Sequence, residues 1–293
     1  MEGRGAGQIL TVQQSGTELG CSGAGGLALG ASRSCEQLAV AAGEVVDGGE
    51  VGERPAGWSL SLYRTAGEAG GAWGYSSASR LGRRASGGSD PERSAVEAGR
   101  RARGQIRRYC TANRLNRLGT LTYRGAGCHD ERQLRSDLAE FFRALRVGTG
   151  GDPFPYLWVP EWHKTDHGLH AHFAVGSYIR RRLVESAWGH GFVHIKLLGD
   201  LPVGSGALAE ARRAALYLSK YVAKEVDRPK VAGLHRYEVA QGFEPACEKV
   251  WSPTLGGVIA EASSRMGASP GYVWQSQVAD GWRRPPAVWL SWG

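Results

Sequence analysis

The run Leu-His-Ala-His-Phe-Ala-Val at residues 169–175 constrains the fold more than any other part of the chain. Its apolar residues alternate with two histidines, which is the pattern of a β-strand with one face in a core. His170 and His172 then share the other face, about 7 Å apart along the strand. Because two imidazoles placed in this way can bind one cation, the sequence predicts a metal site on a sheet.

Glu161 is the third ligand that we expect. It lies in a second predicted strand, 156–162, and faces His170 and His172 if the two strands pair through an even-numbered loop. An odd-numbered loop would place it on the wrong face unless a bulge intervenes. Pro160 cannot donate to a ladder, which favours a bulge or an edge position. Two imidazoles and a carboxylate leave positions for phosphate oxygens, and suit Mg²⁺, Mn²⁺ or a stronger-binding transition ion.

A row of tyrosines and lysines lies on a predicted helix, 207–226. Its members fall at i, i+3, i+4 and i+7 and therefore form one stripe: Tyr217, Lys220, Tyr221 and Lys224. An adjacent stripe can supply the packing: Ala211, Ala215, Leu218 and Val222. The row is then free to face a polar cleft, although amphipathic core tyrosines with solvated lysines would show the same spacing. A phenol with a pKa near 10 needs a cation beside it to act as a nucleophile, and either lysine could provide one.

The order of elements predicts an α+β fold with one central antiparallel sheet and helices packed largely on one face. Expected strands are 117–123, 156–162, 169–175 and 192–198, and expected helices are one that starts near Asp90, then 130–145, 179–188 and 207–226.

Composition divides the chain into three predicted parts. Residues 1–88 are rich in Gly, Ala, Ser and Glu and are expected to be mostly disordered, with 58–63 as a short stretch that could dock as a strand. Residues 89–228 form the expected catalytic domain. Residues 229–293 are a tryptophan-rich extension for packing or DNA contact.

Charge and hydropathy limit the partners and the location. Residues 1–60 carry a net charge of −4 in a chain of net charge +8, so the remaining residues carry +12 and favour a polyanionic partner. No apolar run approaches the length of a membrane span and no signal peptide is recognisable at the start, so a cytoplasmic location without a membrane partner is expected.

Three motifs in this order resemble those of the HUH endonuclease superfamily, most closely the two-tyrosine rolling-circle replication initiators of plasmids and single-stranded-DNA phages. Leu118-Gly-Thr-Leu-Thr-Tyr-Arg124 is similar to the first motif, Glu161 to His172 to the metal motif, and Tyr217 to Lys224 to the two-tyrosine motif. The resemblance implies an HUH nuclease fold, a split ferredoxin or RRM-like layer, with Mg²⁺ or Mn²⁺ at the site.

The resemblance also implies an activity and its partners. The protein would nick one strand of origin DNA, become joined to its 5′-phosphate through Tyr217 or Tyr221, and leave a free 3′-hydroxyl. Residues expected near the DNA are Arg117, Thr122, Tyr123, Arg124, His163 and His167, although packing also explains Tyr123, and the two histidines could equally be outer groups of the metal site or plain loop residues. No GxxxxGK[ST] phosphate loop occurs, so a host helicase and polymerase are implied as partners.

Two other functions remain open at this point. A transposase or a conjugative relaxase would use the same chemistry. A non-catalytic single-stranded nucleic-acid-binding protein could use a similar sheet and its aromatic residues for stacking, but it has no need of two tyrosines beside a metal motif.

Overall fold

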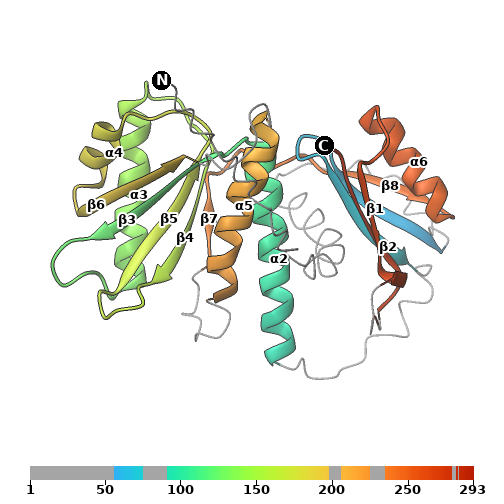
Figure 1. The fold of residues 1–293 in the computed structure, drawn as a ribbon, viewed down its shortest axis with the longest axis horizontal. Coiled ribbons are helices and arrows are strands. Elements are labelled where there is room, and N and C mark those ends of the chain that lie inside the picture. The colour runs from blue at the N-terminus through green and yellow to red at the C-terminus, as the bar shows by residue number, and fades with distance from the viewer. Residues whose placement is uncertain (1–55, 75–90, 198–205, 225–234, 279–281, 283) are drawn as a thin grey trace, which may run out of the picture.

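Two five-stranded antiparallel sheets and the helices packed on them make up the α+β structure, a computed structural model. It describes residues 56–74, 91–197, 206–224, 235–278, 282 and 284–293. Figure 1 shows successive layers, with a helix pair, the first sheet, a second helix pair, the second sheet and a last helix following one another across the molecule. None of the described helices combines the length and the apolar character that a bilayer span needs.

The first sheet carries the predicted metal residues and has the strand order β6-β3-β5-β4-β7. Its strands are β3 (Arg117–Tyr123), β4 (Tyr156–Trp162), β5 (Leu169–Val175), β6 (Gly191–Leu197) and the short β7 (Glu238–Val239). β5 is the central strand and pairs with both β3 and β4. The bounds predicted for β3, β4 and β5 are confirmed, because clear alternation and turn residues mark all three.

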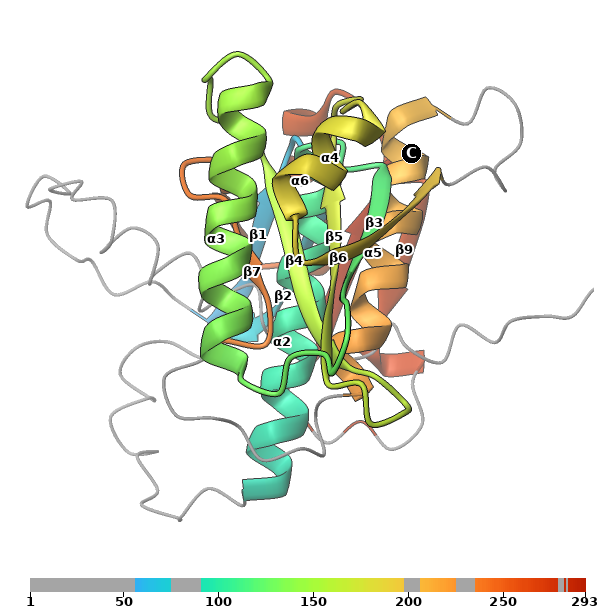
Figure 2. The same ribbon diagram turned by 90° about the vertical axis from the view of Figure 1, so that its left-hand side faces the viewer.

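Helices cover both faces of this sheet, so the prediction of one covered face was wrong. Helices α3 (Glu131–Gly148) and α4 (Arg181–Trp188) pack on one face, and α2 (Pro91–Ala112) and α5 (Gly206–Lys224) pack on the other, as Figure 2 shows. The cause is the apolar character of β4 on both sides. Trp158 faces α3, whereas Leu157 and Val159 are fully buried in the cluster with α2 and α5, and both surfaces must be removed from water.

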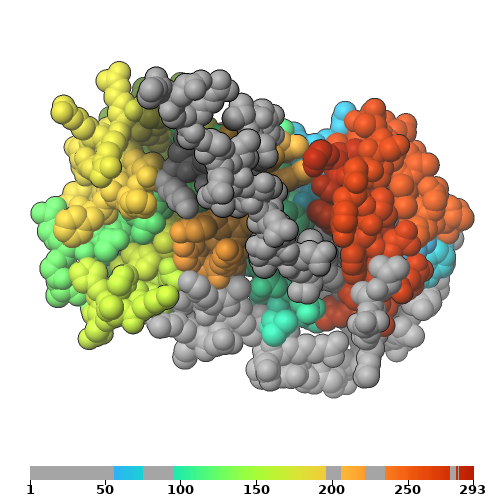
Figure 3. All heavy atoms as spheres, viewed as in Figure 1, coloured from blue at the N-terminus to red at the C-terminus, as the bar shows by residue number. Residues whose placement is uncertain are grey.

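The second sheet joins residues from the two ends of the described chain. Its order is β8-β1-β2-β10-β9, with strands β1 (Gly57–Tyr63), β2 (Glu68–Gly74), β8 (Glu248–Ser252), β9 (Tyr272–Gln275) and β10 (Ala287–Ser291). Helix α6 (Leu255–Met266) packs on one face, against Trp58, Leu60, Leu62 and Trp292. In the space-filling view of Figure 3 this unit forms the right-hand side of the molecule.

Residues 57–74 correct the prediction that 1–88 is mostly disordered. The expected strand at 58–63 is present, and it pairs with β2 along its whole length. The Gly- and Ala-rich composition of β2 belongs to a tightly packed strand, since a Cβ at Gly71 would lie 1.9 Å from the Ser59 carbonyl oxygen. The rest of the range, 1–55 and 75–88, lies outside the described residues.

A buried ion cluster ties the second sheet to the helices that cover the first. Glu68 accepts two hydrogen bonds from Arg107, at 2.6 and 2.8 Å, and lies 3.5 Å from Arg108. Burial alone would raise the pKa of Glu68, but the two arginines outweigh it and hold that pKa below its usual value. On α5, Arg212 donates to the carbonyl oxygen of Trp292 at 2.7 Å. The helix that carries both candidate tyrosines is therefore anchored to the second sheet.

Candidate metal centre

The pairing of β4 with β5 places Glu161 directly opposite His170. The loop between these strands, 163–168, has an even number of residues, and the register runs without a bulge from one end of the pair to the other. Glu161 therefore falls on the histidine face, as the sequence predicted. Pro160 lies past the two residues of β4 that pair with β7, which is the predicted edge position.

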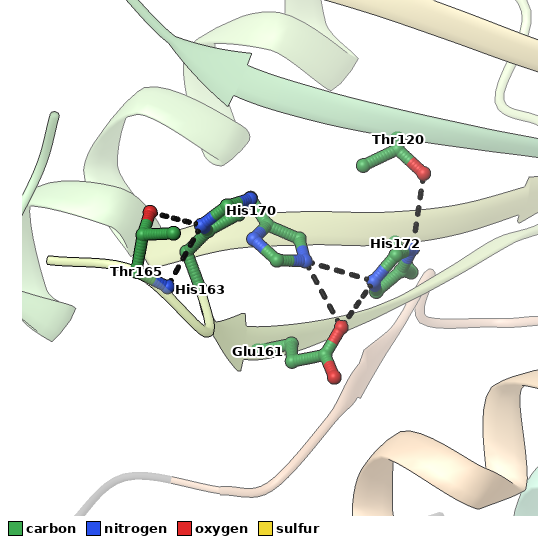
Figure 4. A network of polar contacts seen from close by, with 6 residues as sticks. All are labelled: Thr120, Glu161, His163, Thr165, His170 and His172. Carbon is green, nitrogen blue, oxygen red and sulfur yellow. Dashed lines mark hydrogen bonds and ion pairs between the residues drawn. The ribbon is translucent and has the colours of Figure 1, made fainter. Parts of the chain in front are cut away.

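Three donor atoms converge on this face (Figure 4). The Oε2 atom of Glu161 lies 3.0 Å from Nε2 of His170 and 2.8 Å from Nε2 of His172, and the two nitrogens are 3.0 Å apart. All three side chains are buried. No other group of three or more His, Cys, Asp or Glu side chains within the described part of the chain meets the same geometric test for a metal site. Two imidazoles and one carboxylate on a single point fit a divalent cation and leave positions for further oxygen ligands.

Thr120 on β3 extends the site and was not singled out in the sequence. It pairs with His172, and its Oγ1 lies 3.0 Å from Nδ1 of that residue. When Nε2 binds a cation, the neutral ring carries its proton on Nδ1 and donates it to Thr120, which fixes the tautomer and the ring orientation. The signal was available in the sequence, since Thr120 and Thr122 alternate along β3 and both meet the histidine face.

Substitution of Thr120 by valine should weaken Mn²⁺ binding by about 10- to 100-fold, the effect typical of losing a hydrogen-bond partner behind a metal ligand. Titration of the metal-free protein followed by calorimetry measures this affinity. Thr122→Val is the matched control, because Thr122 lies on the same strand face but opposite His170. Equal Mn²⁺ affinity in the two variants would show that Thr120 does not orient His172.

The 163–168 loop fixes the start of β5. Gly168 has φ +78°, and a Cβ there would lie 2.1 Å from the Cys128 carbonyl oxygen, so only glycine fits. The Nε2 atom of His167 is 2.8 Å from the Tyr123 carbonyl oxygen and must donate to it. His163 is exposed, and its ring lies 5.4 Å from that of His170. His167 thus holds the loop, whereas His163 borders the metal centre from the solvent side.

Both candidate tyrosines lie over the metal centre. The Tyr221 ring stacks on the His172 ring with centroids 3.7 Å apart and planes at 14°, and the Tyr217 ring meets His172 edge-on at 6.2 Å. The two tyrosine rings are 5.2 Å apart. Tyr221 is buried and Tyr217 is half-buried. The packing residues Ala211, Ala215 and Leu218 are fully buried, as predicted for the adjacent stripe.

The environment of Tyr221 disfavours its ionised form. Burial raises the pKa of the Tyr221 phenol well above its usual value, and a hydrogen bond with Tyr217 and the negative charge of Glu161 act in the same direction. A cation bound by Glu161 would offset that last effect. Lys220 is exposed on the same helix, whereas the side chain of Lys224 lies outside the described residues.

The model of one protein family covers this site. The family of the replication-associated protein ORF2 and its phage counterpart matches residues 116–226. No curated protein and no solved structure shows significant similarity to the chain. The matched residues run from the start of β3 to the end of α5, and so include the three candidate metal ligands and both tyrosines. The match to a replication-associated family agrees with the replication-initiator resemblance of the sequence motifs.

The remaining residues expected near DNA are spread over the region that the family model matches. Thr122 faces the metal centre beside His170. Tyr123 points to the opposite face, where it is buried and donates a 2.5 Å hydrogen bond to Asp137, so its role is packing. Arg117 is at the far end of β3, with its guanidinium 5.6 Å from the Tyr178 ring. Arg124 is exposed and donates to the Gly189 carbonyl oxygen at 2.8 Å.

Proposed function

We propose that the protein nicks one strand of DNA and rejoins it, as a replication initiator that uses a tyrosine nucleophile. One observation carries the proposal: two tyrosines from α5 lie against His172 of a three-donor metal centre, within the residues that match a replication-associated family. A cation held by Glu161, His170 and His172 would polarise the scissile phosphate and offset charge that develops on it.

The chain's own residues account for the bond changes. The phenol oxygen of one tyrosine attacks the phosphorus, a Tyr–O–P bond forms, and the bond from phosphorus to the 3′ oxygen breaks. The phenol proton leaves, and the 3′ oxygen takes up a proton to become a free 3′-hydroxyl. Lys220, exposed three residues after Tyr217, can favour the phenolate by its charge.

Rejoining uses the same bonds in reverse. The phosphotyrosyl bond keeps the energy of the broken phosphodiester, so a 3′-hydroxyl can attack it and release the tyrosine. With two tyrosines 5.2 Å apart, one can hold the first 5′-phosphate while the other attacks a second junction. The free 3′-hydroxyl would serve a polymerase, and strand separation would depend on a helicase supplied by the host.

The test is to incubate the protein with single-stranded DNA that carries candidate origin sequences, with Mn²⁺ or with EDTA, and to run a denaturing gel. We expect a metal-dependent covalent protein–DNA band whose linked peptide contains Tyr217 or Tyr221. DNA binding without any such band, across a broad panel of sequences and metal concentrations, would refute the nuclease and favour a non-catalytic binding protein.

A further inference from the structure

The sheet face that carries the metal centre continues past it onto the edge strand β6. Thr122 pairs with His170 on one side and with Phe192 on the other, and Thr120 pairs with His172 and with His194 in the same way. Residues directly opposite in antiparallel strands share a face. Phe192 and His194 therefore face the same side as the metal ligands, two strand spacings or about 10 Å away.

This part of the face is open to solvent. Phe192 is 70% exposed, and His194 is exposed beside it. Helix α5 contacts β4 and β5, and α4 covers the opposite face of β6, where Val193 is buried. An exposed aromatic ring on a strand next to a candidate active site is more than a random surface residue, because the buried packing of β6 lies wholly on its other side.

Cationic residues of α5 border the same opening. Arg213 and Lys220 lie four residues before and three residues after Tyr217, on its side of the helix, and both are exposed. A single aromatic ring among threonine, histidine and cationic side chains suits an unpaired base with phosphates on either side. An apolar protein surface would require a larger contiguous patch.

We propose that Phe192 and His194 form a binding strip for single-stranded DNA next to the scissile phosphate, with one unpaired base stacked on the Phe192 ring. The proposal rests on the proposed function, since it gives the DNA of that reaction its track across the sheet. A distance of about 10 Å corresponds to roughly three nucleotides of a stacked strand, or fewer in an extended one. Arg213 and Lys220 would contact the backbone phosphates along this strip.

Fluorescence anisotropy with a labelled oligodeoxythymidine of about 20 nucleotides, measured in EDTA so that no cutting occurs, tests the strip. We expect Phe192→Ala to weaken binding by about 5- to 140-fold, which is the roughly 1–3 kcal/mol of one stacked base converted at about 1.4 kcal/mol per tenfold. Phe192→Trp should retain the affinity. The matched control is Tyr178→Ala, since Tyr178 is a 73% exposed aromatic residue at the far end of β3.

An abasic nucleotide moved along the oligonucleotide separates stacking from indirect effects. At one position it should weaken binding to the wild-type protein but not to Phe192→Ala, as expected for two groups that interact. Equal affinity of Phe192→Ala and wild type, or loss without such a position, would overturn the strip. Covalent adduct formation by the wild type decides the proposed function separately. An adduct with no Phe192 effect leaves the nuclease standing, whereas a Phe192 effect without an adduct leaves only the strip.

Discussion

Replacing His172 with alanine should lower the rate of covalent adduct formation by at least about 10³-fold, because the loss of several kcal/mol of charge stabilisation at the phosphate corresponds to that factor. His172 provides one of the three converging donors and is also the ring on which Tyr221 stacks. Affinity for single-stranded DNA in EDTA should change little, since backbone and stacking contacts lie elsewhere. Single-turnover adduct formation, followed on denaturing gels over a range of Mn²⁺ concentrations, measures the effect.

Two further variants separate loss of metal from loss of packing. Glu161→Gln keeps the side-chain volume but removes the charge, and it should match His172→Ala in adduct formation and in loss of Mn²⁺ binding. His129→Ala removes an exposed histidine outside the donor set and should behave as wild type. If Glu161→Gln formed adduct at the wild-type rate, Glu161 would not be part of the catalytic centre.

The candidate site could be read from the sequence because it depends on local periodicity. The alternation of β5, the even-numbered 163–168 loop and the helical spacing of Tyr217 and Tyr221 are each contained in a few residues, and together they fix which side chains share a face. The same parity separates Tyr123 from Thr122. Applied to every residue of β3, it would have placed Tyr123 in the core and Thr120 beside His172.

The second sheet could not be read in the same way. β1 and β2 pair with β8 and β10, which lie far along the chain, and no local pattern encodes a pairing over such a separation. The composition of β2 was misleading, because its small residues look like low complexity but serve close strand packing around Gly71. The two-sided cover of the first sheet was missed for a related reason: an apolar strand such as β4 does not reveal which helices cover each face.

Tyr217→Phe should lower the first cleavage of a linear single strand by at least about 10³-fold, whereas Tyr221→Phe should change it by less than about tenfold. Tyr217 is half-buried on the side of α5 that carries exposed Arg213 and Lys220, while Tyr221 is buried against His172 with a raised phenol pKa. The more accessible hydroxyl therefore meets the DNA first. The measurement is single-turnover cleavage of a 5′-labelled oligonucleotide, with the linked peptide identified by mass spectrometry.

Transfer of the held strand to a second junction should need both hydroxyls. Tyr221→Phe is expected to cut and to reseal the original junction, but to lose exchange with a second labelled oligonucleotide, because its only remaining nucleophile is already linked to DNA. Tyr178→Phe, at an exposed site away from the metal centre, should retain both steps. Adduct formation by the double variant Tyr217→Phe/Tyr221→Phe would remove both residues as nucleophiles. Equal losses in the two single variants would instead mean that the hydroxyls act as a coupled pair, with accessibility not deciding which one attacks first.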